Sequence, residues 1–69
     1  MRFKIERYGQ STNMKDGADI TKIVEANDAA DALEKIGCNP SGISSYDSGD
    51  GKVRAVYYGR KWDSYAEPV

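Results

Sequence analysis

The strongest structural signal in this sequence is a short helix that begins after Asp28 and ends at Gly37. The carboxylate of Asp28 can cap the first helical N–H groups, and Asp31 follows three residues later in a variant of the capping box. Gly37 suits the left-handed conformation that ends many helices. The apolar residues between the caps have the spacing of one helical face: Ala29, Ala32, Leu33 and Ile36. A helix of about two turns is not stable alone, so we expect it to pack on a sheet.

Four other segments show the alternation of apolar and polar residues that is typical of half-buried strands. They cover residues 2–8, 20–26, 43–47 and 52–62. In the first segment, Phe3 and Ile5 alternate with charged residues and are expected to face the core. The connecting segments 9–19, 39–42 and 47–51 are rich in turn-forming residues. The final residues, 63–69, contain Pro68 and are expected to fray.

These elements predict a small α+β domain with the order β-β-α-β-β, in which one helix separates two hairpins. The helix would cover one side of the antiparallel sheet and leave the other side to solvent or to a partner. A chain of 69 residues has room for one thin core, so we expect a single domain over residues 1–69 with a frayed tail at about 63–69.

The composition excludes several kinds of chemical site. The sequence has no histidine and a single cysteine, Cys38, so it cannot form an internal disulfide and it lacks the ligands of a zinc site. Cys38 follows the end of the predicted helix, where the helix dipole disfavours a thiolate, and no histidine can deprotonate it. No glycine-rich nucleotide-binding pattern is present. We therefore expect a structural cysteine and a non-enzymatic chain without catalytic residues, cofactor or metal site.

One turn shows a partial likeness to a calcium-binding loop. Asp47 and Asp50 alternate with Gly49 and Gly51, and hard cations bind clustered carboxylates on tight turns. The spacing of such loops and their closing glutamate are missing, and hairpin turns commonly contain the same residues. We favour a hairpin turn here.

The charge balance argues against a general polyanion binder. Ten Lys or Arg residues face eleven Asp or Glu residues, for a net charge of −1. Charged residues interrupt the apolar runs near Met1, and no run approaches the roughly 20 apolar residues of a membrane span. We expect no membrane partner and, with one cysteine, a cytoplasmic location.

The candidate binding residues lie near the end of the last predicted strand. Four aromatic residues and two cations fall within residues 57–65. Tyr, Trp and Arg are enriched at protein–protein hot spots because they bury large areas and keep a polar group. Strand alternation assigns Tyr57 to the core and puts Tyr58 and Arg54 on the open side of the sheet, and we assign Arg60 and Trp62 to the exposed set with Tyr58. The predicted partner-binding residues are Arg54, Tyr58, Arg60, Lys61, Trp62 and Tyr65. Tyr8 and Arg7 would join them if the first and last strands pair.

Other functions stay open at this point. Four basic residues could share the open face with aromatic residues and bind single-stranded nucleic acid: Arg2, Lys4, Arg54 and Arg60. Glu6 on the same strand face and the net charge weigh against this. Acidic residues around Asp28 could engage a basic groove on a partner, but such residues are also simply good helix caps. An exposed sheet edge could pair with a second copy, so a homodimer is open as well.

The stretch Val24–Ile36, a strand that runs into a capped helix, is similar to the strand-to-helix junctions of small phage and mobile-element proteins. With the chain length, the single cysteine and the expected element order, the sequence resembles anti-CRISPR and other anti-defence proteins. The resemblance implies an inhibitor that acts by stoichiometric binding to a host defence complex. No residue motif defines that group, so the resemblance implies no site residues.

Overall fold

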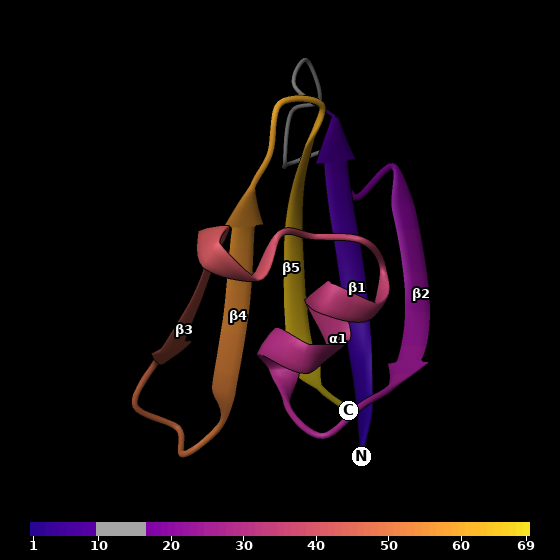
Figure 1. Cartoon of the computed structure of the whole chain (residues 1–69). Helices are drawn as coiled ribbons and strands as arrows, with labels where there is room; N and C mark the ends of the chain where they lie inside the picture. The colour runs from indigo at the N-terminus through magenta and orange to yellow at the C-terminus, as the bar shows by residue number, and fades with distance from the viewer. Residues whose placement is uncertain (10–16) are drawn as a thin grey trace.

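The computed structural model describes residues 1–9 and 17–69, which form a five-stranded antiparallel sheet with one helix on one face (Figure 1). The elements are β1 (Arg2–Gly9), β2 (Ile20–Glu25), α1 (Ala29–Lys35), the 3-10 turn η2 (Pro40–Gly42), β3 (Ile43–Asp47), β4 (Val53–Tyr58) and β5 (Trp62–Pro68). The predicted α+β class, with one helix packed on a small antiparallel sheet, is confirmed. Most of the predicted loop 9–19, residues 10–16, lies outside the described residues.

The last strand lies in the middle of the sheet. The strand order is β2-β1-β5-β4-β3, and each neighbouring pair is antiparallel. β5 therefore pairs with β1 on one side and with β4 on the other, as Figure 1 shows. β2 and β3 form the two edges.

Two predictions about the C-terminal part were wrong. The expected strand 52–62 ends at Tyr58, and the expected frayed tail 63–69 is almost entirely part of β5. The chain reverses because Gly59 N donates a hydrogen bond to the carbonyl oxygen of Trp62 at 2.9 Å, which closes a tight turn. Beyond the turn, Ser64 and Ala66 are buried and alternate with more exposed residues, as a central strand requires. The observed order is therefore β-β-α-β-β-β.

The helix caps confirm the sequence prediction at both ends. Asp28 Oδ1 accepts a hydrogen bond from Asp31 N at 2.7 Å, and Asp31 Oδ2 accepts one from Asn27 N at 2.9 Å. The second bond reaches back one residue further than in a standard capping box. At the other end, Gly37 has a φ of 99° and donates from its N–H to the Glu34 carbonyl oxygen. Cys38 N then donates to the Leu33 carbonyl oxygen, which completes a Schellman motif.

The core lies between α1 and one face of the sheet. Phe3 and Ile5 of β1 are buried against Leu33, and the remaining buried cluster consists mostly of small residues: Ala26, Ala29, Ala32, Cys38, Ala55 and Ala66. Small side chains let a short helix approach the sheet closely. Cys38 is buried in this cluster directly after the helix, in a structural position.

Tyr57 faces the helix side of the sheet, as strand alternation predicted, and packs against the core. A Cβ atom added at Gly42 would lie 2.7 Å from the Tyr57 Cε1 atom, and one added at Gly59 would lie 3.0 Å from its Cε2 atom. The Tyr57 ring thus lies between Gly42 and Gly59, and its contacts with both connect η2 to the β4–β5 turn.

A truncation tests the central position of β5. Deletion of residues 63–69 should abolish the cooperative thermal unfolding transition measured by circular dichroism, because β1 and β4 both lose a hydrogen-bonded neighbour. Deletion of the exposed Val69 alone is the matched control and should leave the transition in place. A folded, cooperatively melting protein without residues 63–69 would show that the segment is a dispensable tail.

Candidate functional site

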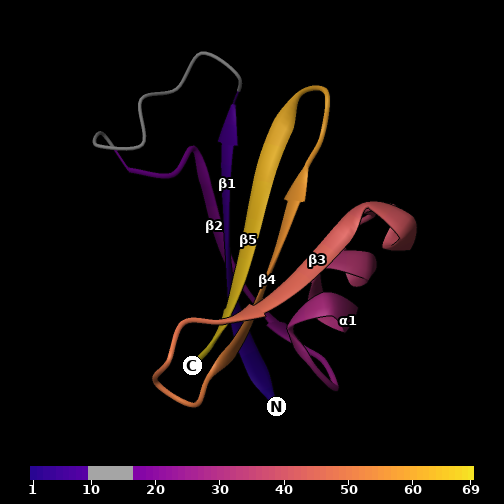
Figure 2. The same ribbon diagram turned by 90° about the vertical axis from the view of Figure 1, so that its left-hand side faces the viewer.

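Four strands each present one tyrosine on the sheet face opposite α1. Tyr8 of β1 and Tyr58 of β4 both lie opposite Asp63 of β5 in the strand register, so they share its face. Tyr65 and Tyr46 lie on the same face by alternation along β5 and β3. Figure 2 shows α1 on only one side of the sheet. We call this set, Tyr8, Tyr46, Tyr58 and Tyr65, the tyrosine face.

Tyr65 is the centre of this group. Its ring contacts that of Tyr8 edge to face, with centroids 5.7 Å apart and planes at 82°. It contacts the ring of Tyr58 in the same manner, at 6.3 Å and 85°. Such edge-to-face pairs hold aromatic rings in fixed orientations. Around the half-buried Tyr65, the side chains of Tyr58 and Tyr46 remain 69% and 41% exposed and are free to contact a partner.

The tyrosine face contains a shallow hollow of about 300 Å³. Tyr8, Tyr46 and Tyr65 line it together with charged side chains from β1, β4 and β5. A hollow of this size with aromatic walls can receive a side chain or a small ligand group.

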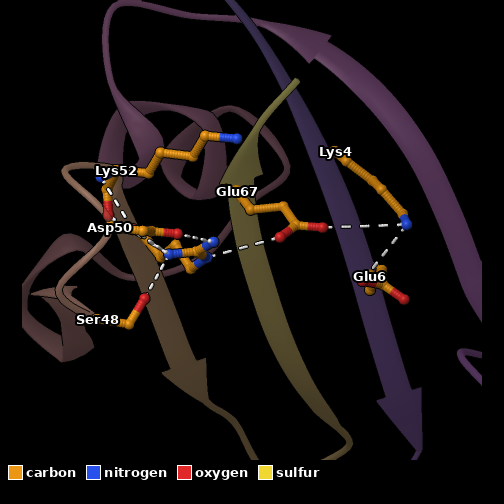
Figure 3. A network of polar contacts seen from close by, with 7 residues as sticks. Lys4, Glu6, Ser48, Asp50, Lys52 and Glu67 are labelled. Carbon is orange, nitrogen blue, oxygen red and sulfur yellow. Dashed lines mark hydrogen bonds and ion pairs between the residues drawn. The ribbon is translucent and has the colours of Figure 1, made fainter.

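The charged side chains form a continuous row of alternating sign across the face (Figure 3). Arg54 pairs with Asp50 at 2.9 Å and with Glu67 at 3.6 Å. Glu67 also pairs with Lys4 at 4.0 Å, and Lys4 pairs with Glu6 at 3.8 Å. Both cations of the row are therefore already engaged by carboxylates. The hollow combines aromatic surface with charges that largely cancel one another.

The pair at one end of the row stays ionised over a wide pH range. The hydrogen bonds from Arg54 lower the pKa of the Asp50 carboxyl to about 2, and Asp50 in turn raises the pKa of the Arg54 guanidinium. Asp50 Oδ1 also accepts from Lys52 N at 3.0 Å, and Asp47 Oδ1 accepts from Gly49 N at 2.8 Å. These bonds are the ones expected of a hairpin turn.

The structure brings together only part of the predicted site. Arg54, Tyr58 and Tyr65 lie on the tyrosine face or border it. Arg60 and Lys61 form the β4–β5 turn beside it, and within residues 1–9 and 17–69 neither has an ion-pair partner.

Trp62 lies on the other side of the sheet, contrary to prediction. Continuous alternation from Tyr58 would have put it on the open side, but the turn reverses the chain and pairs Gly59 with Trp62. The Arg7 guanidinium carbon lies 5.4 Å from the Trp62 ring centroid, in a cation–π arrangement. Arg7 Nε also donates to the hydroxyl oxygen of the buried Ser64 at 3.1 Å.

Tyr46 is the member that sequence reasoning missed, and Tyr8 depended on an unknown strand pairing. The alternation of segment 43–47 already placed the side chains of Tyr46 and Ile43 on opposite faces of the sheet, so the sequence did indicate on which face Tyr46 lies. Nothing local indicated that this side would meet Tyr65, because that proximity depends on the order of the strands.

The hydroxyls of Tyr8 and Tyr65 remain protonated at neutral pH, because the pKa of each is raised. Burial, with a hydrogen bond involving Tyr58, raises the pKa of Tyr65 to about 12. Burial and the nearby Glu6 carboxylate, which accepts a hydrogen bond from the Tyr8 hydroxyl at 3.3 Å, also raise the pKa of Tyr8. These groups can donate hydrogen bonds to a partner.

Spectroscopic titration of tyrosine tests this arrangement. The last phenol to ionise should have a pKa of about 12 and should disappear from the absorbance titration in Tyr65→Phe. An unfolded tyrosine ionises near pH ~10, so the stability due to Tyr65 should be complete below that pH and be lost as pH rises toward about 12. Tyr57→Phe is the control on the opposite face and should leave the last step unchanged. Ionisation of all five tyrosines near pH ~10 in the folded protein would contradict the packing of Tyr65.

The described residues offer little else of chemical interest. Residues 1–9 and 17–69 contain no group of three or more cysteine, aspartate or glutamate side chains placed to hold a metal ion. The same part of the chain contains no helix with the length and apolar character needed to cross a membrane. Comparisons with protein-family models, curated proteins and solved structures gave no match.

Proposed function

We propose that this chain is a non-enzymatic protein-binding module that contacts its partner through the tyrosine face. The observation that carries the proposal is the gathering of four tyrosines, three of which line a hollow, on a sheet face that no helix in the described part of the chain covers. Tyrosine buries a large rigid ring and keeps a hydroxyl for hydrogen bonding, so it contributes strongly to protein interfaces.

The charges around the hollow favour a protein partner of mixed polarity. The row from Asp50 to Glu6 alternates in sign, so it creates little long-range field of either sign. Recognition would then depend on shape and on short-range contacts rather than on attraction of a highly charged molecule. A side chain of the partner inserted into the hollow would meet three tyrosine rings and could exchange hydrogen bonds with the row.

Binding of single-stranded nucleic acid is the second candidate. The exposed rings of Tyr46 and Tyr58 could stack bases. The cations Arg60 and Lys61, which have no ion-pair partner among residues 1–9 and 17–69, lie in the adjoining turn. A phosphate would have to displace Glu67 from Lys4 and Arg54 to use the cations of the face itself. This competition makes nucleic acid the weaker candidate.

A host defence complex would be a more specific partner than the unspecified protein proposed above. The suggestion of such a complex comes from the resemblance to anti-CRISPR proteins, which rested in part on the element order β-β-α-β-β. Because β5 adds a strand to that order, the support for this partner is now the chain length, the single cysteine and the strand-to-helix stretch. The proposal of the tyrosine face as the contact surface does not depend on it.

Site-specific photo-crosslinking tests the contact surface. A photoreactive amino acid replaces Tyr58 or Tyr46 on the tyrosine face, or the exposed Glu34 of α1 as the matched control. In lysate of the source cells, positions 46 and 58 should give one crosslinked protein band, and position 34 should not. Crosslinking from position 34 alone would show that the helix side is the contact surface.

Affinity measurements on the captured partner extend the test. Tyr58→Ala should weaken binding by about 30-fold or more, which corresponds to the ~2 kcal/mol typical of a tyrosine hot spot, and Glu34→Ala should leave it unchanged. If the partner is instead an oligonucleotide, binding should fall steeply as salt rises, and this outcome would replace the first candidate with the second.

A further inference from the structure

The edge strand β2 has exposed side chains, and on its outer backbone edge the Glu25 carbonyl oxygen accepts a hydrogen bond from Lys35 Nζ at 3.0 Å. It pairs with β1 on one side, and in the described part of the chain no strand pairs with its other side. Its sequence, Ile-Thr-Lys-Ile-Val-Glu, is rich in β-branched residues and contains no proline. Ile23 is 55% exposed. Edge strands of this kind attract another strand unless charge, proline or a covering segment protects them.

The hydrogen-bond pattern of the β1–β2 ladder determines which backbone groups of β2 point away from β1. Ala26 N donates to the Met1 carbonyl oxygen, so Ala26 and Met1 form a hydrogen-bonded pair in the β1–β2 register. Pairs of this type alternate along an antiparallel ladder. The N–H and C=O groups of Thr21, Ile23 and Glu25 therefore point away from β1, outward from the sheet.

These three residues are self-complementary in one antiparallel register. If Ile23 lies opposite Ile23 of a second copy, Thr21 lies opposite Glu25. Every outward N–H and C=O of the three then has a partner in the second copy once Lys35 Nζ releases the Glu25 carbonyl oxygen. The two exposed Ile23 side chains then cover one another, and each Thr21 hydroxyl can donate to a Glu25 carboxylate. On the helix side, Lys22 lies opposite Val24, which its aliphatic stem can cover.

Neighbouring registers of the same symmetry are less favourable. A shift of two residues in one direction brings Lys22 opposite Lys22 of the second copy, with like charges in contact. A shift in the other direction leaves Thr21 beyond the end of the partner strand and puts Ile23 opposite Glu25. Figure 1 shows the ribbon of α1 over the middle of the sheet and away from β2, and Lys35 of α1 reaches the Glu25 carbonyl oxygen at one end of this edge.

We propose that two copies of this chain pair through β2 as an antiparallel homodimer with a continuous sheet. The two-fold axis is perpendicular to the sheet and passes beside Ile23. Both helices then lie on the same side, and the two tyrosine faces lie together on the other.

Mass and amide exchange test the dimer together. Sedimentation or light scattering should give about twice the 7.6 kDa mass of one chain at high protein concentration. The amides of Thr21, Ile23 and Glu25 should exchange with solvent at least about tenfold more slowly at high protein concentration than at low protein concentration. A monomeric mass at every concentration, or exchange of these amides that is independent of concentration, would overturn the proposal.

Matched substitutions at the two sheet edges locate the interface. Ile23→Lys, which puts two cations opposite each other, and Thr21→Pro, which removes an outward N–H, should each give the monomer mass. Ser45→Pro is the control at the other edge strand, β3. The Gly59–Trp62 hydrogen bond fixes which residues of β4 bond to β5, and the N–H and C=O of Ala55 are among them. Ser45 lies opposite Ala55, so its own N–H points away from β4. Ser45→Pro should stay dimeric. A dimer that Ile23→Lys does not dissociate, or that Ser45→Pro or Tyr58→Ala does, would overturn the choice of β2.

Discussion

The backbone hydrogen bonding of β5 to both of its neighbours is the interaction on which the rest of the structure depends. Without β5, β1 with β2 and β4 with β3 would be two separate hairpins, each too small to be stable alone. With β5 in place, the buried Ser64 and Ala66 leave room for α1 on one face. On the other face, Tyr65 contacts the rings of Tyr8 and Tyr58. One strand thus completes the core and assembles the tyrosine face.

The same strand explains why the charges of this face are balanced. Glu67 of β5 lies between Lys4 of β1 and Arg54 of β4 and pairs with both. Exposed ion pairs of this type contribute at most about 1 kcal/mol each to stability. Their consequence is for recognition, because they leave an aromatic hollow with little net charge rather than a basic groove. This balance is the physical reason to favour a protein partner over nucleic acid.

Local patterns in the sequence predicted the elements but not their arrangement. The caps at Asp28 and Gly37 predicted the helix, and alternation predicted the facing of Phe3, Tyr57 and Tyr58 correctly. β5 was missed because Trp62–Pro68 contains neither valine nor isoleucine, includes a proline and follows a turn whose residues 60–61 are not typical turn formers. Pairing between the first and last strands is a long-range property, so the meeting of Tyr8 with Tyr65 could not be derived from the sequence.

Native-state hydrogen exchange tests the central position of β5 most directly. The Val69–Arg2 hydrogen bond sets the alternation along the β1–β5 ladder, so the amides of Tyr65 and Glu67 point to β1 and that of Ala66 points to β4. These amides should be among the slowest to exchange, with opening free energies close to that of global unfolding. Exchange across residues 63–68 as fast as in an unfolded chain, in a protein that is otherwise folded, would contradict this arrangement of the sheet.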